Sequence, residues 1–169
     1  IARRKDVRRL LDIGCGDGEN MSLFRHLPLR LAGLEVSEPR LQAARQDGLD
    51  VLQARGESLP FPAGSWDMIY IAHVLHHVAH YEQVLGEIDR CLAADGTVFV
   101  VETVEDNPLL RLGRRIRPSW RGDALEVAWR FDDLVKELER GGFEVEESGR
   151  YNIVFFLWEM APLKFWPLE

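Results

Sequence analysis

Three glycines and several acids gather near the start of the chain, in the segment "RLLDIGCGDGEN" (Arg9 to Asn20). Gly14, Gly16 and Gly18 follow a short apolar run that is typical of a buried strand. Glycine has no β-carbon, so a turn rich in glycine lets a ligand approach the main chain closely. The segment therefore predicts a binding site for a nucleotide-type ligand at the end of a first strand.

The acids around these glycines help to choose the ligand. A dinucleotide-binding turn has the pattern G-x-G-x-x-G, and its pyrophosphate sits at the helix N-terminus. Here Glu19 occupies the third glycine position, and Asp17 adds a second carboxylate at the same helix start. These two acids compete with phosphate, although they also suit the helix dipole without any ligand. They are compatible with a cationic ligand such as S-adenosylmethionine, and Asp12 would add a third carboxylate.

A further acid, Glu35, closes the expected second strand. Its distance along the chain is close to the offset of about 20 residues at which an acid binds ribose hydroxyls in nucleotide-binding sheets. Asp12, Gly14, Gly16 and Glu35 together predict a nucleotide-type cofactor.

Strands and helices alternate along the chain, which predicts the elements that position these residues. Strands are expected at Arg9–Ile13, Leu31–Val36, Asp50–Ala54, Trp66–Ala72 and Thr97–Glu102, and helices near Glu19–Leu27, between Ser37 and Gly48, at His80–Ala94 and at Phe131–Arg140. Two β-prone segments, "FEVEES" and "NIVFFLW", follow, the second as an antiparallel final strand. The alternation predicts an α/β fold: a doubly wound, mostly parallel sheet flanked by helices, in one domain over residues 1–169.

Composition excludes several classes of function. The 169 residues fit one domain, and the net charge of −7 argues against general nucleic-acid binding. With only two cysteines, Cys15 and Cys91, a disulfide framework is not expected, and a reducing cytoplasm is the expected location. The apolar run Ile153 to Trp158 is far shorter than the ~20 residues of a membrane-spanning helix, so no stable membrane insertion is expected.

Five segments, in order, resemble class I S-adenosylmethionine-dependent methyltransferases. They are "LLDIGCGDGE", "GLEVSEPRL", "GESLPFPAGSWDMIYIAHVLHHV", "LGEIDRCLAADGTVFVVE" and "RFDDLVKELERGGFEVEES", between Arg9 and Ser148. The chain is most similar to the small-molecule group with an "LPFP" loop. The resemblance implies a Rossmann-like methyltransferase fold and methyl transfer from S-adenosyl-L-methionine to an oxygen, nitrogen or carbon of a small-molecule acceptor. The product would be S-adenosyl-L-homocysteine.

The resemblance also implies roles for individual residues. The methionine half of the cofactor would be lined by Asp12, Gly14, Cys15 and Gly16, and the sulfonium would lie near Ala72 and His73. Glu35 would take both ribose hydroxyls. The adenine would contact Val36 and would be edged by Gly56, Glu57 and Ser58. The chain departs from the family pattern at Arg55, where many relatives carry an acid, and in "AADG", which replaces the usual "KPGG".

Three histidines follow the expected fourth strand, where an acceptor would approach. His73 is a candidate catalytic base or a wall of the cofactor site, and both interpretations stay open. The rings of His76 and His77 are expected to bond to backbone at a helix start. No metal site is expected, because no nearby cysteine or aspartate completes a ligand set with these histidines.

Residues 107–130 show no clear period and are a candidate lid or substrate segment. The segment holds an arginine cluster, which could clamp a carboxylate or phosphate or form a solvated helix face: Arg111, Arg114, Arg115, Arg117 and Arg121. The aromatic tail after it, including Phe165 and Trp166, is expected to pack on the core or else to form a homodimer interface.

Two alternatives of other classes remain at this point. An NAD-dependent oxidoreductase is disfavoured by Glu19 and the acidic helix start. A non-catalytic, methyltransferase-like cofactor-binding or scaffold protein stays open, because little of the chain precedes the first strand. A thermal shift with S-adenosylhomocysteine but not with NAD would exclude the first of these.

Overall fold

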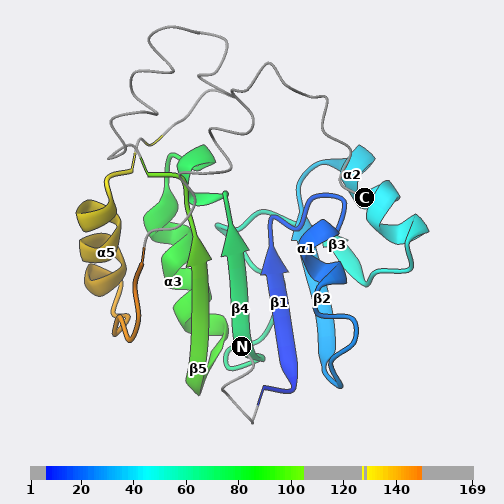
Figure 1. Cartoon of the computed structure of the whole chain (residues 1–169), viewed down its shortest axis with the longest axis horizontal. Coiled ribbons are helices and arrows are strands. Elements are labelled where there is room, and N and C mark those ends of the chain that lie inside the picture. The colour runs from blue at the N-terminus through cyan, green and yellow to red at the C-terminus, as the bar shows by residue number, and fades with distance from the viewer. Residues whose placement is uncertain (1–6, 105–126, 128, 150–169) are drawn as a thin grey trace, which may run out of the picture.

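The computed structural model describes residues 7–104, 127 and 129–149. Five strands form one sheet: β1 (Arg9–Ile13), β2 (Arg30–Glu35), β3 (Val51–Gln53), β4 (Trp66–Ala72) and β5 (Leu92–Val101). The helices are α1 (Glu19–Ser22), α2 (Glu38–Gln46), α3 (Tyr81–Cys91) and α5 (Phe131–Arg140), with a short 3₁₀ helix η1 (Leu75–His77) after β4. All the strand pairs in the described sheet are parallel, and the arrows of β1, β4 and β5 point the same way in Figure 1.

The strand order, β3-β2-β1-β4-β5, confirms the doubly wound α/β fold. The chain moves outward from β1 to β3 and then returns to place β4 beside β1. In such sheets ligands bind outside the carboxyl ends of the strands, at the point where the order reverses. The turn after β1 and the segment after β4 both lie at that point, so the fold brings the two predicted site regions together.

Apolar side chains cover both faces of the sheet. On one face, Leu11 and Ile13 of β1 belong to a large cluster with α3 and α5. A smaller cluster includes Met21 of α1 and Leu41 of α2. Because side chains alternate along a strand, Asp12 points to the face opposite Leu11 and Ile13. A carboxylate in the middle strand of the sheet is therefore enclosed by the core.

The predicted strands and helices differ from the structure mainly at their ends. Helix α1 covers only Glu19–Ser22 and gives way to turns, whereas a helix to Leu27 was expected. Strand β5 begins at Leu92, directly after α3. The "ADG" sequence is expected as a turn that closes the helix, but it lies within β5 instead. At this point the pairing register of β5 with β4 shifts, between Trp66 and Met68 of β4. A bulge in the ladder absorbs these extra residues.

The second half of the chain leaves several predictions open. Within the described residues, "FEVEES" (143–148) forms no strand, because no neighbouring strand pairs with it there. The expected antiparallel final strand, the arginine cluster and the aromatic tail lie outside the described residues, as does most of the candidate lid. In the described part of the chain, none of the helices has both the length and the apolar character that crossing a membrane requires.

Candidate functional site

The glycine turn after β1 is held in a backbone conformation that favours glycine. Gly14, Gly16 and Gly18 have φ angles of +72°, +60° and +89°. The N–H groups of Gly14 and Cys15 both donate to the carbonyl oxygen of Leu34, at 2.8 and 2.9 Å. The turn is thus tied to the end of β2, which brings Glu35 beside it.

The three glycines serve different purposes. A β-carbon on Gly14 would lie 2.2 Å from Val74 Cγ2, and one on Gly18 would lie 2.0 Å from Leu49 Cδ1. On Gly16 the nearest atom would be the Arg40 Nη1, at 3.8 Å. Gly14 and Gly18 therefore allow close packing within the protein, whereas Gly16 leaves open space beside the turn where a ligand can reach the main chain.

Asp12 is the most unusual acid of the site. Its residue is 1% exposed, and in the described structure neither carboxylate oxygen accepts a hydrogen bond. Burial, together with the nearby charge of Glu35, raises the pKa of Asp12 to about 7. A buried carboxylate without a partner is costly, and a cationic group placed beside it would remove that cost.

Glu35, in contrast, is already engaged by the backbone. Its Oε2 accepts a hydrogen bond from the N–H of Gly16 at 3.0 Å, and its Oε1 accepts from Val36 and Ser37, both at 2.8 Å. A carboxylate has about four lone-pair directions, so three of them are in use. Glu35 can accept one hydroxyl as it stands, and a grip on two hydroxyls requires the release of one backbone bond.

Two other residues of this region take opposite positions. The Cys15 side chain is buried and packs in the cluster of Met21, and burial beside Asp12 raises the pKa of the thiol to about 12. Only the main chain of Cys15 can therefore face a ligand. The Val36 residue is 59% exposed, which leaves its apolar side chain available to a flat ring.

The residues after β3 form a turn that leads back to the core. The Ser58 N–H donates to the carbonyl of Arg55 at 3.2 Å, and Gly56 packs against Val84. The Arg55 guanidinium donates to the Glu57 carboxylate at 3.1 Å and lowers the pKa of Glu57. Arg55, which departs from the family pattern, thus pairs with an acid of its own turn.

The backbone after β4 is strained at a candidate catalytic residue. Ala72 is buried at the end of the strand, and His73, an exposed residue, has a φ of +56°. Among the described residues it is the only non-glycine with a positive φ. Such strain gathers at functional sites.

The His73 N–H donates to the carbonyl of Val101 at 2.8 Å, and its ring Nδ1 lies 3.2 Å from Thr103 Oγ1. Partial burial of the ring lowers the pKa of His73.

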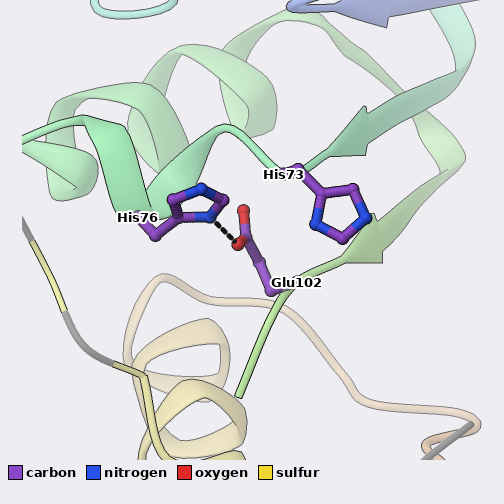
Figure 2. Close-up of side chains that lie close together, drawn as sticks. All are labelled: His73, His76 and Glu102. Atoms are coloured by element: carbon purple, nitrogen blue, oxygen red, sulfur yellow. Dashed lines mark hydrogen bonds and ion pairs between the residues drawn. The ribbon is translucent and has the colours of Figure 1, made fainter. Parts of the chain in front are cut away.

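Glu102, directly after β5, holds this segment in place. Its Oε1 accepts hydrogen bonds from the N–H groups of Val74 at 2.9 Å and Leu75 at 2.7 Å. Its Oε2 lies 2.5 Å from Nδ1 of His76, as Figure 2 shows, and the side chains of His76 and Glu102 are 9% and 0% exposed. The expectation that the His76 ring bonds to backbone is therefore wrong, because its partner is a carboxylate.

Sequence reasoning did not identify Glu102 as a site residue. The signal was present, because Glu102 ends the predicted strand Thr97–Glu102, and the carboxyl ends of parallel strands meet at one edge of a sheet. In the structure Ala72 of β4 lies beside Val101 of β5, which brings Glu102 to the histidines. The expectation of no metal site rested on the lack of a nearby cysteine or aspartate and left out this glutamate.

Comparison with known proteins shows which family has this sequence pattern. A family model described as "Methyltransferase domain" matches residues 11–100, more than half of the chain. A demethylmenaquinone methyltransferase of Thermus thermophilus is 36% identical over 110 residues, which are 60% of this chain and 50% of that protein. The 24-methylenesterol C-methyltransferase 2 of Oryza sativa is 31% identical over 160 residues, 86% of this chain and 44% of that protein. The chain thus spans about half the length of these curated relatives.

Solved structures show the same fold. A putative methyltransferase from Bacillus halodurans superposes with a TM-score of 0.72 at 23% identity, over 85% of this chain and 65% of that one. An S-adenosylmethionine-dependent methyltransferase from Thermotoga maritima gives a TM-score of 0.71 at 24% identity, over 80% and 63% of the two chains.

Proposed function

We propose, from the premise that this chain belongs to the S-adenosylmethionine-dependent methyltransferase family, that it transfers a methyl group from that cofactor to a small organic acceptor. The match of residues 11–100 to the family model establishes the membership. It favours this function over the nicotinamide-dependent oxidoreductase considered from the sequence.

The observation that carries the proposal is the buried carboxylate of Asp12, which has no hydrogen-bond partner among the described residues and lies near Glu35, the acid that bonds the Gly16 N–H. S-adenosylmethionine carries an ammonium and a sulfonium, so it offers the positive charge that this carboxylate lacks. Glu35 lies across the turn, bonded to the Gly16 N–H, where it can accept a ribose hydroxyl. The residues of the site therefore fit the cofactor of the family.

The protein's own residues would mainly bind and orient. When bound, the cofactor supplies a methyl group already activated by the sulfonium, so methyl transfer needs alignment and exclusion of water more than proton chemistry. Asp12 would anchor the cationic end, Glu35 the ribose and exposed Val36 the adenine. Gly56, Glu57 and Ser58 would edge the adenine from the turn after β3.

His73 lies at the end of β4, after Ala72, on the side where the acceptor would approach. A base contributes only if the acceptor loses a proton, and it then contributes typically ~100- to 10,000-fold. We propose that His73 contacts the acceptor or the methyl-bearing end of the cofactor. His73→Gln should lower kcat while leaving the affinity for S-adenosylhomocysteine within about twofold. Unchanged kcat would remove His73 from the reaction.

For the acceptor, the relatives suggest an apolar ring system. The names of the two similar proteins specify a demethylmenaquinone and a sterol as acceptors, and the sterol enzyme methylates carbon. We propose a small hydrophobic acceptor of one of these kinds. We expect the residues after position 100, which lie outside the family match, to decide between these acceptors.

The test uses the whole chain in two steps. Calorimetry should show binding of S-adenosylhomocysteine and no binding of NAD, and binding of NAD alone would contradict the proposal. Incubation with isotopically labelled methyl donor and either a demethylmenaquinone or a sterol should then place the label in one acceptor. Cofactor binding with no transfer to any metabolite in an extract would favour the non-catalytic alternative.

A further inference from the structure

We propose that His73, His76 and Glu102 form a binding site for a divalent transition-metal ion, with Zn²⁺ as the best match. One ligand-capable atom from each residue lies within 4.8 Å of the other two. Figure 2 shows the two imidazole rings on either side of the Glu102 carboxylate. The three residues come from the end of β4, from η1 and from the end of β5, so the fold assembles them from separate segments.

The donor set suits such an ion. Two imidazole nitrogens and one carboxylate oxygen are the protein ligands of a common class of catalytic zinc site, which leaves a fourth position open. Imidazole favours zinc and other late first-row ions over Mg²⁺ and Ca²⁺, which prefer oxygen ligands. Because His73 is exposed, water or an oxygen of another molecule can complete the coordination.

The ligands are already oriented by hydrogen bonds outside the set. The N–H groups of Val74 and Leu75 fix the Glu102 carboxylate, and the bond from the His73 N–H to Val101 fixes the backbone of the first histidine. Supporting bonds of this kind position the ligands of metal sites. The strained φ of His73 places its ring beside the carboxylate, which gives the strain a purpose.

Metal binding would change one contact. The His76 Nδ1 and Glu102 Oε2 now lie 2.5 Å apart, at hydrogen-bond distance. Two ligands that each lie about 2.1 Å from one zinc ion are usually about 3 Å or more apart, so these side chains must separate slightly. A metal ion at Nδ1 requires the neutral tautomer that carries its one ring proton on Nε2, and the ring reaches that tautomer by giving the Nδ1 proton to water and taking another at Nε2. No oxidation or reduction is involved.

An ion at this place could orient an oxygen-bearing acceptor. That role rests on the proposed function, because it requires methyl transfer at the same end of the sheet. The binding of the ion does not rest on it, so the two proposals can fail separately. A protein that binds S-adenosylhomocysteine but no zinc would keep the first proposal and overturn the second.

The experiment is a calorimetric titration of the untagged, metal-free chain with zinc chloride. We expect one ion per chain and a loss of affinity of at least about tenfold in His73→Ala. The control is His80→Ala, an exposed histidine of the same stretch of chain that is outside the cluster, and it should bind zinc like the parent. Absence of saturable binding, or equal affinities of the two variants, would overturn the proposal.

A second variant guards against loss of folding. His73 is exposed, so His73→Ala should keep its circular dichroism spectrum and melting transition. Glu102→Gln should also weaken zinc binding, because a neutral amide is a poorer ligand than a carboxylate. If Glu102→Gln binds zinc as tightly as the parent while folded, the carboxylate is not a ligand and the proposed site is wrong.

Discussion

The glycine turn after β1 and the histidine segment after β4 each lie beside a buried carboxylate, and the surroundings of the two carboxylates are opposite. Asp12 of β1 accepts no hydrogen bond from any described residue. Glu102, after β5, accepts from two backbone N–H groups and faces the His76 ring. The comparison teaches that hydrogen bonds within the protein hold the Glu102 carboxylate in a fixed position, whereas the Asp12 carboxylate, which lacks such bonds, is suited to a cationic ligand.

The largest expected effect is on the Glu102 side. Glu102→Ala leaves two buried N–H groups and the His76 ring without their acceptor, so the free energy of unfolding should fall by roughly 3–5 kcal/mol. Urea denaturation measures it. The matched control is Glu102→Gln, whose amide oxygen can still accept from the backbone while its NH₂ donates to His76, so it should lose much less. Equal losses in the two variants would break the comparison.

On the Asp12 side the expected change in stability has the opposite sign. The folded-state pKa of about 7 lies above the ordinary 3.8, so the stability contributed by Asp12 is full below about pH 4 and is lost as the pH rises through 7. At pH 8 the free energy of unfolding of Asp12→Asn should therefore be roughly 2–4 kcal/mol higher than that of the parent, and this difference should shrink toward pH 4. Asp17→Asn, at an exposed acid of the same turn, should gain nothing. A less stable Asp12→Asn at pH 8 would contradict the assignment.

A smaller effect is expected at Glu35, which combines both kinds of surroundings. Glu35→Ala removes a charged acceptor of ribose hydroxyls, so binding of S-adenosylhomocysteine should weaken by roughly 1.5–3 kcal/mol in calorimetry. Some stability should also be lost, because three backbone N–H groups lose their acceptor. Glu38→Ala, at an exposed acid of α2, is the control and should leave affinity unchanged. Equal affinities of the two variants would remove Glu35 from the ribose site.

The smallest effect separates backbone strain from ligand contact. Gly16 and Gly64 have similar φ angles of +60° and +67°, and a β-carbon meets no atom closer than 3.8 Å at either position. Alanine at each should cost roughly 1–2 kcal/mol of stability, measured by thermal unfolding. Only Gly16→Ala should also weaken binding of S-adenosylhomocysteine, because its methyl group enters the open space beside the turn. Equal affinities of the two variants would mean that the ligand does not lie beside Gly16.

The arrangement of the glycine turn beside Glu35 could largely be predicted from the sequence, because its residues are local. Asp12, the glycines and Glu35 lie within one strand–turn–helix–strand unit, where a short motif specifies both conformation and position. The structure adds what spacing cannot show: Gly14 and Gly18 serve packing, and the Cys15 side chain faces away into the core.

The arrangement of the histidines after β4 could not be predicted to the same extent, because it depends on contacts between distant segments. Glu102 lies 26 residues after His76, and their pairing follows from the neighbouring positions of β4 and β5 in the sheet. Helix α3 was predicted well, since Val84, Ile88 and Cys91 recur on its buried face. The bulge in β5 was not, because "ADG" is also a common turn sequence.

The central claim is that the unpaired carboxylate of Asp12 binds the positively charged group of the cofactor. Calorimetry at about pH 6, repeated in two buffers with different heats of ionisation, counts the protons released when S-adenosylhomocysteine binds. Because free Asp12 titrates with a pKa of about 7 and a bound ammonium favours its charged form, the parent should release close to one proton per chain, whereas Asp12→Asn should release none and bind more weakly. Equal affinity and equal proton release in the two proteins would contradict the account.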